Sequence, residues 1–194
     1  MDQLDPAEAK TELRNRLIEF RRQRSDADRA EAAKANGRQL RELLDGAAVV
    51  CGYLPLPSEP LSVALLDALV AAGTSVLVPV VAENAPLDWC RYPAPTSPGR
   101  FGIAEPDGPR LGPSAVRSAT AVLVPALAVD GFGSRLGRGG GHYDRTLALL
   151  HPDRVQLVAV LFDGEIVSGI PTGPHDVPVT AAVTPTGGIA HFRR

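Results

Sequence analysis

The stretch Ala121-Val-Leu-Val-Pro-Ala-Leu-Ala-Val-Asp130-Gly-Phe-Gly-Ser-Arg135-Leu-Gly-Arg-Gly-Gly-Gly141-His-Tyr-Asp144-Arg145 is the most informative part of this chain. It opens with a continuous apolar run, passes through a loop rich in glycine and arginine, and ends in a helix-like segment, Tyr143 to Leu150. A strand, a glycine loop and a helix in this order aim backbone N–H groups at an anion. The stretch therefore predicts a unit of an α/β fold that carries a phosphate-binding loop.

Two residue types suit this loop to phosphate. Glycine permits positive φ angles and close backbone approach, which a side chain would block. Arginine supplies a planar, permanently charged group that matches phosphate geometry. The loop has neither the Gly-Lys-Ser/Thr of a Walker loop nor a G-x-G-x-x-G pattern, so a surface glycine loop with solvated arginines remains the alternative. The residues concerned are Arg135, Gly137, Arg138, Gly139, Gly140, Gly141 and Arg145, with Asp144 able to hold a cation between phosphates.

Apolar strands and helices alternate along the rest of the chain. The predicted strands are continuously apolar, which indicates burial on both faces and a parallel sheet between helices. We expect a three-layered α/β fold with a mainly parallel sheet, forming a single domain over residues 1–194. The strands are expected at Ala47 to Tyr53, Ser75 to Val81, Ala121 to Pro125 and Gln156 to Phe162, with a helix at Leu61 to Ala72.

Two helices precede this pattern. Asp5 with Glu8 forms a capping box, and Ser25 with Asp28 repeats it before a helix that runs to about Leu44. In the first helix Lys10 and Arg14 lie four residues apart and share one face, which could equally be a solvated face. The expected buried stripe consists of Ala9, Leu13, Leu17 and Phe20.

Composition excludes several classes of protein. The formal net charge of −2 and balanced charges in the N-terminal region leave no basic face for nucleic acid. No apolar run reaches the ~20 residues of a bilayer span, and no signal peptide is visible, so we expect a cytoplasmic protein with no membrane association. Cys51 and Cys90 have no metal-ligand spacing and are expected to be buried thiols. We expect a monomer.

Ligands of open parallel sheets bind beyond the carboxyl ends of the strands. Tyr53 to Glu59, Val124 to Gly141 and the segment after Phe162 all follow a predicted strand, so we expect them to converge. Pro93 to Pro113 is rich in proline and glycine and is either a substrate-side loop or a disordered crossing. Trp89 lies beside it, either as a ring platform or as a core residue.

These residues carry a resemblance to the 5-formyltetrahydrofolate cyclo-ligase family. Val124 to Arg145 resembles the signature V-P-G-x-x-F-D-x-x-G-x-R-L-G-x-G-x-G-Y-Y-D-R of that family. It departs at Ala126, Val129 and His142, where glycine, an aromatic residue and tyrosine are usual. The other landmarks follow in family order: Lys10 with Arg14, Tyr53 to Glu59, Phe101 to Pro106, and His175 with Asp176.

The resemblance implies cyclisation of 5-formyltetrahydrofolate, with or without a polyglutamate tail, to 5,10-methenyltetrahydrofolate. It implies ATP and Mg²⁺ as cofactors, release of ADP and phosphate, an imidoyl phosphate intermediate, and a fold like that of sugar-phosphate isomerases and CoA transferases. The implied catalytic residues are Lys10, Arg14 and Arg135. The implied ATP-binding residues are those three with Leu136, Gly137, Arg138, Gly139, Gly140, Gly141, His142 and Tyr143; the implied folate-binding residues are Tyr53, Glu59, Trp89, Phe101, Gly102, Ile103 and Glu105; the implied magnesium ligands are Asp144 and Asp176.

Two other functions fit the glycine loop. A sugar-phosphate isomerase would use the loop for a single phosphate and would need a base beside it, for which Lys10 is the only lysine plausibly available. A regulatory domain could bind a nucleotide or sugar phosphate without turnover.

Overall fold

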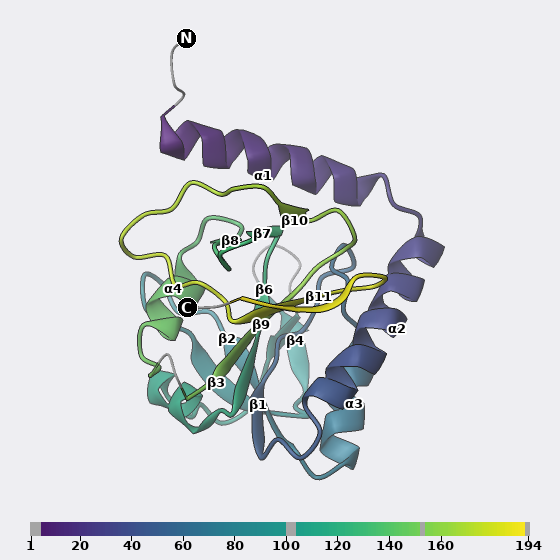
Figure 1. Ribbon diagram of the computed structural model, residues 1–194. Coiled ribbons are helices and arrows are strands. Elements are labelled where there is room, and N and C mark those ends of the chain that lie inside the picture. The colour runs from purple at the N-terminus through teal and green to yellow at the C-terminus, as the bar shows by residue number, and fades with distance from the viewer. Residues whose placement is uncertain (1–4, 100–103, 152–153, 193–194) are drawn as a thin grey trace.

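The central feature of the computed structural model is a seven-stranded sheet with strand order β12-β11-β9-β6-β1-β2-β3 (Figure 1). The structure describes residues 5–99, 104–151 and 154–192. The pairs from β11 through β9, β6 and β1 to β2 are parallel, and the edge strands β12 and β3 pair antiparallel. The strands are β1 (Val49–Cys51), β2 (Ser75–Val80), β3 (Asp88–Tyr92), β6 (Ala121–Pro125), β9 (Gln156–Val160), β11 (Ala181–Thr184) and β12 (Gly188–His191).

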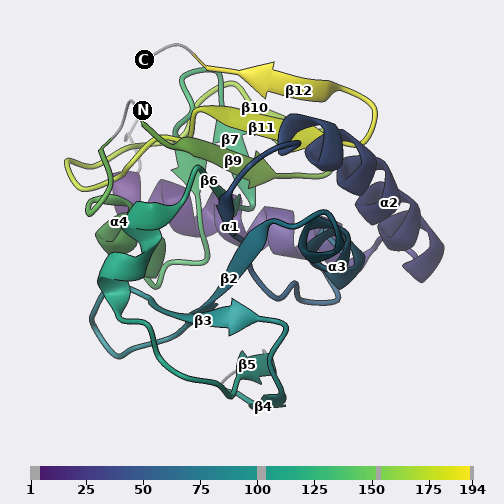
Figure 2. The same ribbon diagram turned by 90° about the horizontal axis from the view of Figure 1, so that it is seen from below.

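Helices cover both faces of this sheet, so the predicted three-layered α/β fold with a mainly parallel sheet is confirmed (Figure 2). One face packs against α2 (Asp26–Leu43) and α3 (Val63–Ala71), which contribute Leu40 and Leu66 to its core. The other face packs against α4 (His142–Leu147) and a 3₁₀ helix, η2 (Pro113–Ser118).

Burial on both faces explains the continuous apolar strands. In β6, Val122 and Val124 belong to the core on the α4 side, whereas Ala121 and Leu123 belong to the core under α2 and α3. Successive side chains of a strand point to opposite faces, so a strand between two helical layers needs apolar residues at every position.

Two small sheets accompany the central one. A three-stranded sheet has the order β10-β7-β8, formed by β7 (Ala128–Asp130), β8 (Arg135–Leu136) and β10 (Ile166–Val167). It follows the carboxyl ends of β6 and β9 and lies between them and α1 (Pro6–Arg22) (Figure 1). The second is the hairpin of β4 (Thr96–Pro98) and β5 (Ala104–Pro106), beyond β3 (Figure 2). Part of the segment expected to be a loop or a disordered crossing is therefore an ordered hairpin.

The two N-terminal helices begin where their caps predicted. Asp5 accepts a hydrogen bond from the Ala7 backbone N–H at 3.3 Å, and Ser25 accepts one from the Asp28 backbone N–H at 3.1 Å. Within the described ranges, none of the helices is long and apolar enough to cross a bilayer. Cys51 and Cys90 are both buried free thiols, as expected.

Candidate functional site at the carboxyl ends of the strands

Helix α1 lies across the carboxyl end of the sheet (Figure 1). The side chains that it turns toward the rest of the molecule include three cations. Lys10, Arg14 and Arg21 each bond to a residue far along the chain, and Leu17 is buried between them at the same helical spacing. The expected stripe was wrong at Phe20, which is 46% exposed and lies under the Arg24 guanidinium. The side of α1 that faces the molecule therefore carries Lys10, Arg14 and Arg21 with Leu17, and it is not the apolar stripe that the sequence predicted.

The glycine loop lies directly under this face. Arg14 Nε donates to the Gly137 carbonyl oxygen at 3.0 Å, which joins α1 to the loop. Gly139 and Gly141 have φ angles of +99° and +65°, whereas Gly137 and Gly140 do not lie in the left-handed region. A Cβ at Gly139 would contact the Arg14 guanidinium. Positive φ is thus required at two of the four predicted positions.

Two carboxylates predicted to bind one metal are brought to neighbouring positions. Asp144 Oδ1 accepts hydrogen bonds from Arg135 Nη2 at 2.7 Å and from the Val177 backbone N–H at 3.3 Å. Asp176 Oδ2 accepts from Lys10 Nζ at 2.6 Å and from the Gly173 backbone N–H at 2.8 Å. Burial alone would raise the pKa of Asp176, but the hydrogen bonds from Lys10 and Gly173 outweigh it and lower that pKa.

Arg135 joins Asp144 to the backbone segment that carries Asp176. Its side chain is almost fully buried, and Nη1 donates to the Val177 carbonyl oxygen at 2.7 Å. The guanidinium therefore holds Asp144 and the segment at Asp176 together. Over the part of the chain that the structure describes, no cluster of three or more His, Cys, Asp or Glu side chains could hold a metal. A divalent ion here would need phosphate oxygens and waters besides the carboxylates.

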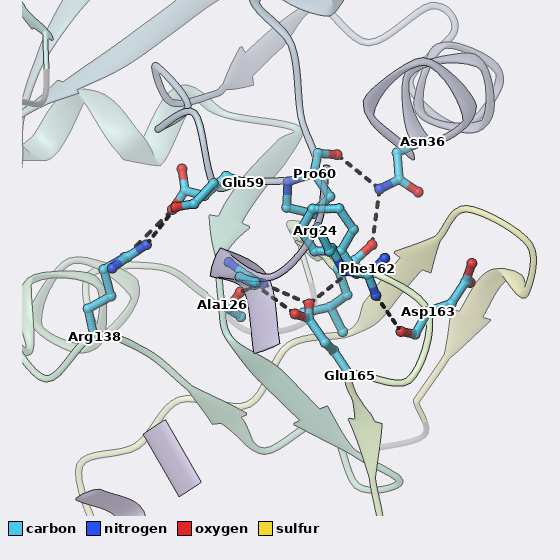
Figure 3. A network of polar contacts seen from close by, with 12 residues as sticks. Arg24, Asn36, Glu59, Pro60, Ala126, Arg138, Phe162, Asp163 and Glu165 are labelled. Atoms are coloured by element: carbon cyan, nitrogen blue, oxygen red, sulfur yellow. Dashed lines mark hydrogen bonds and ion pairs between the residues drawn. The ribbon is translucent and has the colours of Figure 1, made fainter. Parts of the chain in front are cut away.

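A buried polar cluster lies beside the glycine loop and consists of Glu59, Tyr53 and Tyr143. Glu59 Oε2 accepts from the Leu56 backbone N–H at 2.9 Å, and Arg138 Nε lies 3.9 Å from Oε1 (Figure 3). Burial raises the pKa of Glu59, although the Leu56 hydrogen bond and the charges of Arg138 and Arg21 oppose this rise. Burial and the charge of Glu59 raise the pKa values of both tyrosines.

The two tyrosine hydroxyls of this cluster are buried without a hydrogen-bond partner among the described residues. A buried hydroxyl without a partner costs about 1–3 kcal/mol, so each is expected to be satisfied by a water or a ligand. The sequence analysis assigned Tyr143 to ATP, but its hydroxyl lies in the electrostatic field of Glu59, among the residues assigned to folate.

The burial of two predicted contact residues, Trp89 and Leu136, requires a correction, whereas the prediction for Glu105 stays a prediction. Trp89 is fully buried in the core on the α4 side, so its ring offers no surface to a ligand. The Leu136 side chain packs in the core under α1 beside Leu17, so only its backbone could approach ATP. Glu105 lies on the β4–β5 hairpin and pairs with Arg110 at 3.3 Å. The predicted Phe101, Gly102 and Ile103 lie outside the described residues.

The remaining loop residues lie at its rim. Arg138 is exposed and donates to Ser58 Oγ at 3.3 Å, which joins the loop to the segment after β1. Arg145 Nη2 donates to the Gly140 carbonyl oxygen at 2.9 Å and lies 3.3 Å from His142 Nδ1. The glycine loop is thus held by arginine side chains while Gly139 and Gly140 stay exposed.

The sequence analysis missed a buried ion pair between Arg21 and Glu165. Arg21 Nε and Nη2 each donate to one Glu165 carboxylate oxygen at 2.7 Å, and Nη2 also donates to the Ala126 carbonyl oxygen at 2.7 Å (Figure 3). Arg21 follows Arg14 by seven residues, two helical turns, so the spacing of Lys10 and Arg14 could have been extended to it.

Comparison with known proteins agrees with this architecture. The family model of the 5-formyltetrahydrofolate cyclo-ligase family matches residues 6–185. A 5-formyltetrahydrofolate cyclo-ligase of Mycolicibacterium smegmatis is 42% identical over 191 residues, covering 95% of this chain and 98% of the relative.

Two solved structures are similar to the whole domain. The 5,10-methenyltetrahydrofolate synthetase of Aquifex aeolicus superimposes with a TM-score of 0.74 at 28% identity, covering 95% of this chain and 93% of that one. The 5,10-methenyltetrahydrofolate synthetase of Mycoplasma pneumoniae superimposes with a TM-score of 0.72 at 16% identity, covering 89% and 96%, and so supports the fold alone. Because the family model spans most of the chain and the Mycolicibacterium relative matches nearly all of it, this chain belongs to the 5-formyltetrahydrofolate cyclo-ligase family.

Proposed function

We propose that this protein cyclises 5-formyltetrahydrofolate to 5,10-methenyltetrahydrofolate, with ATP converted to ADP and phosphate. The observation that carries the proposal is the convergence of Lys10 and Arg14 on the glycine loop and on Asp176, in a chain of the cyclo-ligase family. Sugar-phosphate isomerisation and nucleotide binding without turnover have less support, because the family match extends over both the loop and the buried Glu59.

The proposed chemistry needs activation of a formamide oxygen, which is a poor leaving group. The formyl oxygen attacks the γ-phosphorus of ATP, and ADP departs. N10 attacks the carbon of the resulting imidoyl phosphate, which closes the ring, and N10 releases its proton; the C–O bond then breaks, and phosphate leaves with the bonding electrons. The protein's task is to align the two substrates and to balance the charge of the transferred phosphoryl group. Lys10, Arg14 and Arg135 supply positive charge beside the glycine loop.

The residues present fit a magnesium ion bound together with ATP. Asp144 and Asp176 are two oxygen ligands on neighbouring backbone segments, which is the number that Mg²⁺ commonly takes from a protein when phosphates supply others. Bound there, the ion would neutralise phosphate charge. Lys10 is bonded to Asp176, so binding of ATP with Mg²⁺ would exchange this ion pair for contacts to phosphate and metal.

The folate would bind on the other side of the loop. Glu59 is a buried acceptor in the same cluster as the Tyr53 and Tyr143 hydroxyls, for which the described residues supply no hydrogen-bond partner. The amide and amine edge of a pterin offers N–H donors to a carboxylate. The raised pKa of Glu59 comes mainly from burial, and hydrogen bonds donated by a ligand would offset that cost.

The first prediction is the activity. Purified protein given ATP, Mg²⁺ and 5-formyltetrahydrofolate should develop the near-ultraviolet absorbance of the methenyl product, and omission of ATP should abolish it. A thermal-shift series with ATP and Mg²⁺, 5-formyltetrahydrofolate or ribose 5-phosphate distinguishes the alternatives, because a ligand at 100 times its Kd stabilises by roughly 2.7 kcal/mol. Stabilisation and isomerisation of ribose 5-phosphate without methenyl product would contradict the proposal.

The second prediction concerns α1. Lys10→Ala or Arg14→Ala should raise KM for ATP, because each removes a charge beside the loop, at about 1.5–3 kcal/mol per charged contact. KM for folate should change little. Arg16→Ala, on the exposed side of the same helix, is the control. Steady-state kinetics with either substrate varied would refute the assignment if both variants kept the wild-type KM for ATP.

The third prediction concerns the two carboxylates. Asp144→Asn and Asp176→Asn should each raise the Mg²⁺ concentration for half-maximal rate about tenfold or more, without loss of folate binding. Because both act through one ion, the double variant should lose less than the sum of the single losses. A Mg²⁺ titration of the four proteins, with the exposed Asp45→Asn as control, measures this. Strictly additive losses would show that the two side chains do not share a metal.

A further inference from the structure

The Arg21–Glu165 ion pair joins α1 to the ends of two central strands. Arg21 bonds the Ala126 carbonyl, directly after β6, and Glu165, in the turn after β9. Glu165 Oε2 also accepts from the Phe162 backbone N–H at 2.8 Å (Figure 3). Arg21 is 2% exposed and Glu165 is 0% exposed, so every one of these bonds is shielded from water.

Few apolar side chains compete with this pair in placing the helix. From Ala7 to Arg22, Leu17 is the buried apolar residue of α1, and Leu13 and Ile18 are only partly buried against the small sheet. Apolar contacts tolerate sliding and rotation, whereas a bidentate arginine–carboxylate pair with a third bond to a carbonyl allows one orientation. Arg21 therefore fixes the C-terminal half of α1 along and about its axis, with a further bond from Arg24 to the Asp163 carbonyl oxygen at 3.3 Å just beyond the helix.

That position matters at the other end of the helix. Lys10 and Arg14 precede Arg21 by three and two helical turns on the same face, and they reach Asp176 and the glycine loop. A rotation or shift of α1 at Arg21 would be transmitted along a continuous helix to both cations. A shift of about 1 Å in the groups that position a substrate can lower the rate of its reaction about 100-fold.

Stability alone does not account for such a pair. Removing two charges from water costs several kcal/mol per ion, and replacement of a buried ion pair by apolar residues of similar size is often neutral or stabilising. What the ion pair contributes is a fixed orientation, and the element whose orientation it fixes is α1, which lies over the glycine loop.

We propose that Arg21 and Glu165 are positioning residues for ATP, which act by holding Lys10 and Arg14 over the glycine loop. The inference rests on the proposed function and deepens it: both side chains are buried, so they would act through the placement of α1. Loss of this buried pair should therefore weaken the binding of ATP far more than the binding of folate.

The test compares the double variant Arg21→Met/Glu165→Leu with wild type in titration calorimetry against a non-hydrolysable β,γ-imido analogue of ATP with Mg²⁺. We expect the Kd for the analogue to rise about tenfold or more. Arg21 also acts on Glu59 through its charge, but the double variant removes one positive and one negative charge together, so the Kd for 5-formyltetrahydrofolate should stay within about twofold. In a Lys10→Ala/Arg14→Ala background, the same two substitutions should cost less than about twofold further, because the cations that they position are absent.

The control is Glu19→Gln/Arg22→Met, which removes an exposed ion pair of the same helix and should leave both affinities unchanged. If the double variant does not fold, Arg21→Lys takes its place, because lysine keeps the charge but cannot hold both Glu165 oxygens and the Ala126 carbonyl. An unchanged Kd for the analogue, or equal losses for analogue and folate, overturns the inference while the proposed function stands. Wild type that fails to bind the analogue overturns the proposed function as well.

Discussion

Arg21→Ala is expected to destabilise the protein by about 3–5 kcal/mol, because it leaves the Glu165 carboxylate buried without its partner. The same substitution removes the bond to the Ala126 carbonyl and the guanidinium that lies 5.5 Å from the Phe162 ring centroid. Urea unfolding followed by circular dichroism, with the denaturant slope unchanged, measures the loss.

The neighbouring Arg22 supplies the control. It pairs with Glu19 at 3.7 Å on the exposed side of α1, and Arg22→Ala should cost about 0–1 kcal/mol. The Arg21→Met/Glu165→Leu variant should recover most of the stability that Arg21→Ala loses, because no unpaired charge remains. A loss in Arg21→Ala as small as that in Arg22→Ala would contradict the dependence of the buried Glu165 carboxylate on its partner.

Gly133→Ala is expected to cost about 3 kcal/mol or more. Gly133 has a φ angle of +81°, a conformation that costs other residues roughly 1–2 kcal/mol. A Cβ there would also overlap the Val179 carbonyl oxygen, which is backbone and cannot turn aside. Relief of that overlap would break the hydrogen bond from the Val179 N–H to the Gly133 carbonyl, now 2.9 Å long.

Gly131, two residues earlier in the same turn, is the matched control. A Cβ at Gly131 would meet nothing within 4 Å, so Gly131→Ala should change stability by about 0.5 kcal/mol at most. Thermal unfolding of the two variants side by side separates backbone strain from a general effect of lengthening the side chain in this turn. Equal melting temperatures would show that the turn can shift away from Val179.

The layers of the fold were predictable because they depend on local patterns. Ala121–Pro125 was predicted to the residue, since its apolar run is bounded by polar and turn residues. The antiparallel edge strands β3 and β12 were not predicted. Each is a short run of mixed polar and apolar residues, which shows neither a strand periodicity nor the strand with which it pairs. The β4–β5 hairpin was missed for the same reason, and its proline and glycine content suggested a loop.

Candidate site residues could be predicted from the sequence where the charge of the side chain itself suggests its role. Lys10, Arg14 and Asp176 converge as expected, although they are far apart in sequence. Trp89 was assigned to the folate because aromatic residues serve both cores and ligands, and only burial distinguishes them. Glu165 could not be identified, because a carboxylate after a strand acquires its importance from a partner 144 residues away.

The wide sequence separation of these contacts bears on synthesis of the protein. Lys10 meets its partner 166 residues later, so this ion pair cannot form until Asp176 has left the ribosome. The strands β1, β2 and β6 are close together in sequence and can pair earlier, because shorter loops cost less entropy to close. The ion pair between Lys10 and Asp176 would therefore form later in translation than the pairing of β1, β2 and β6.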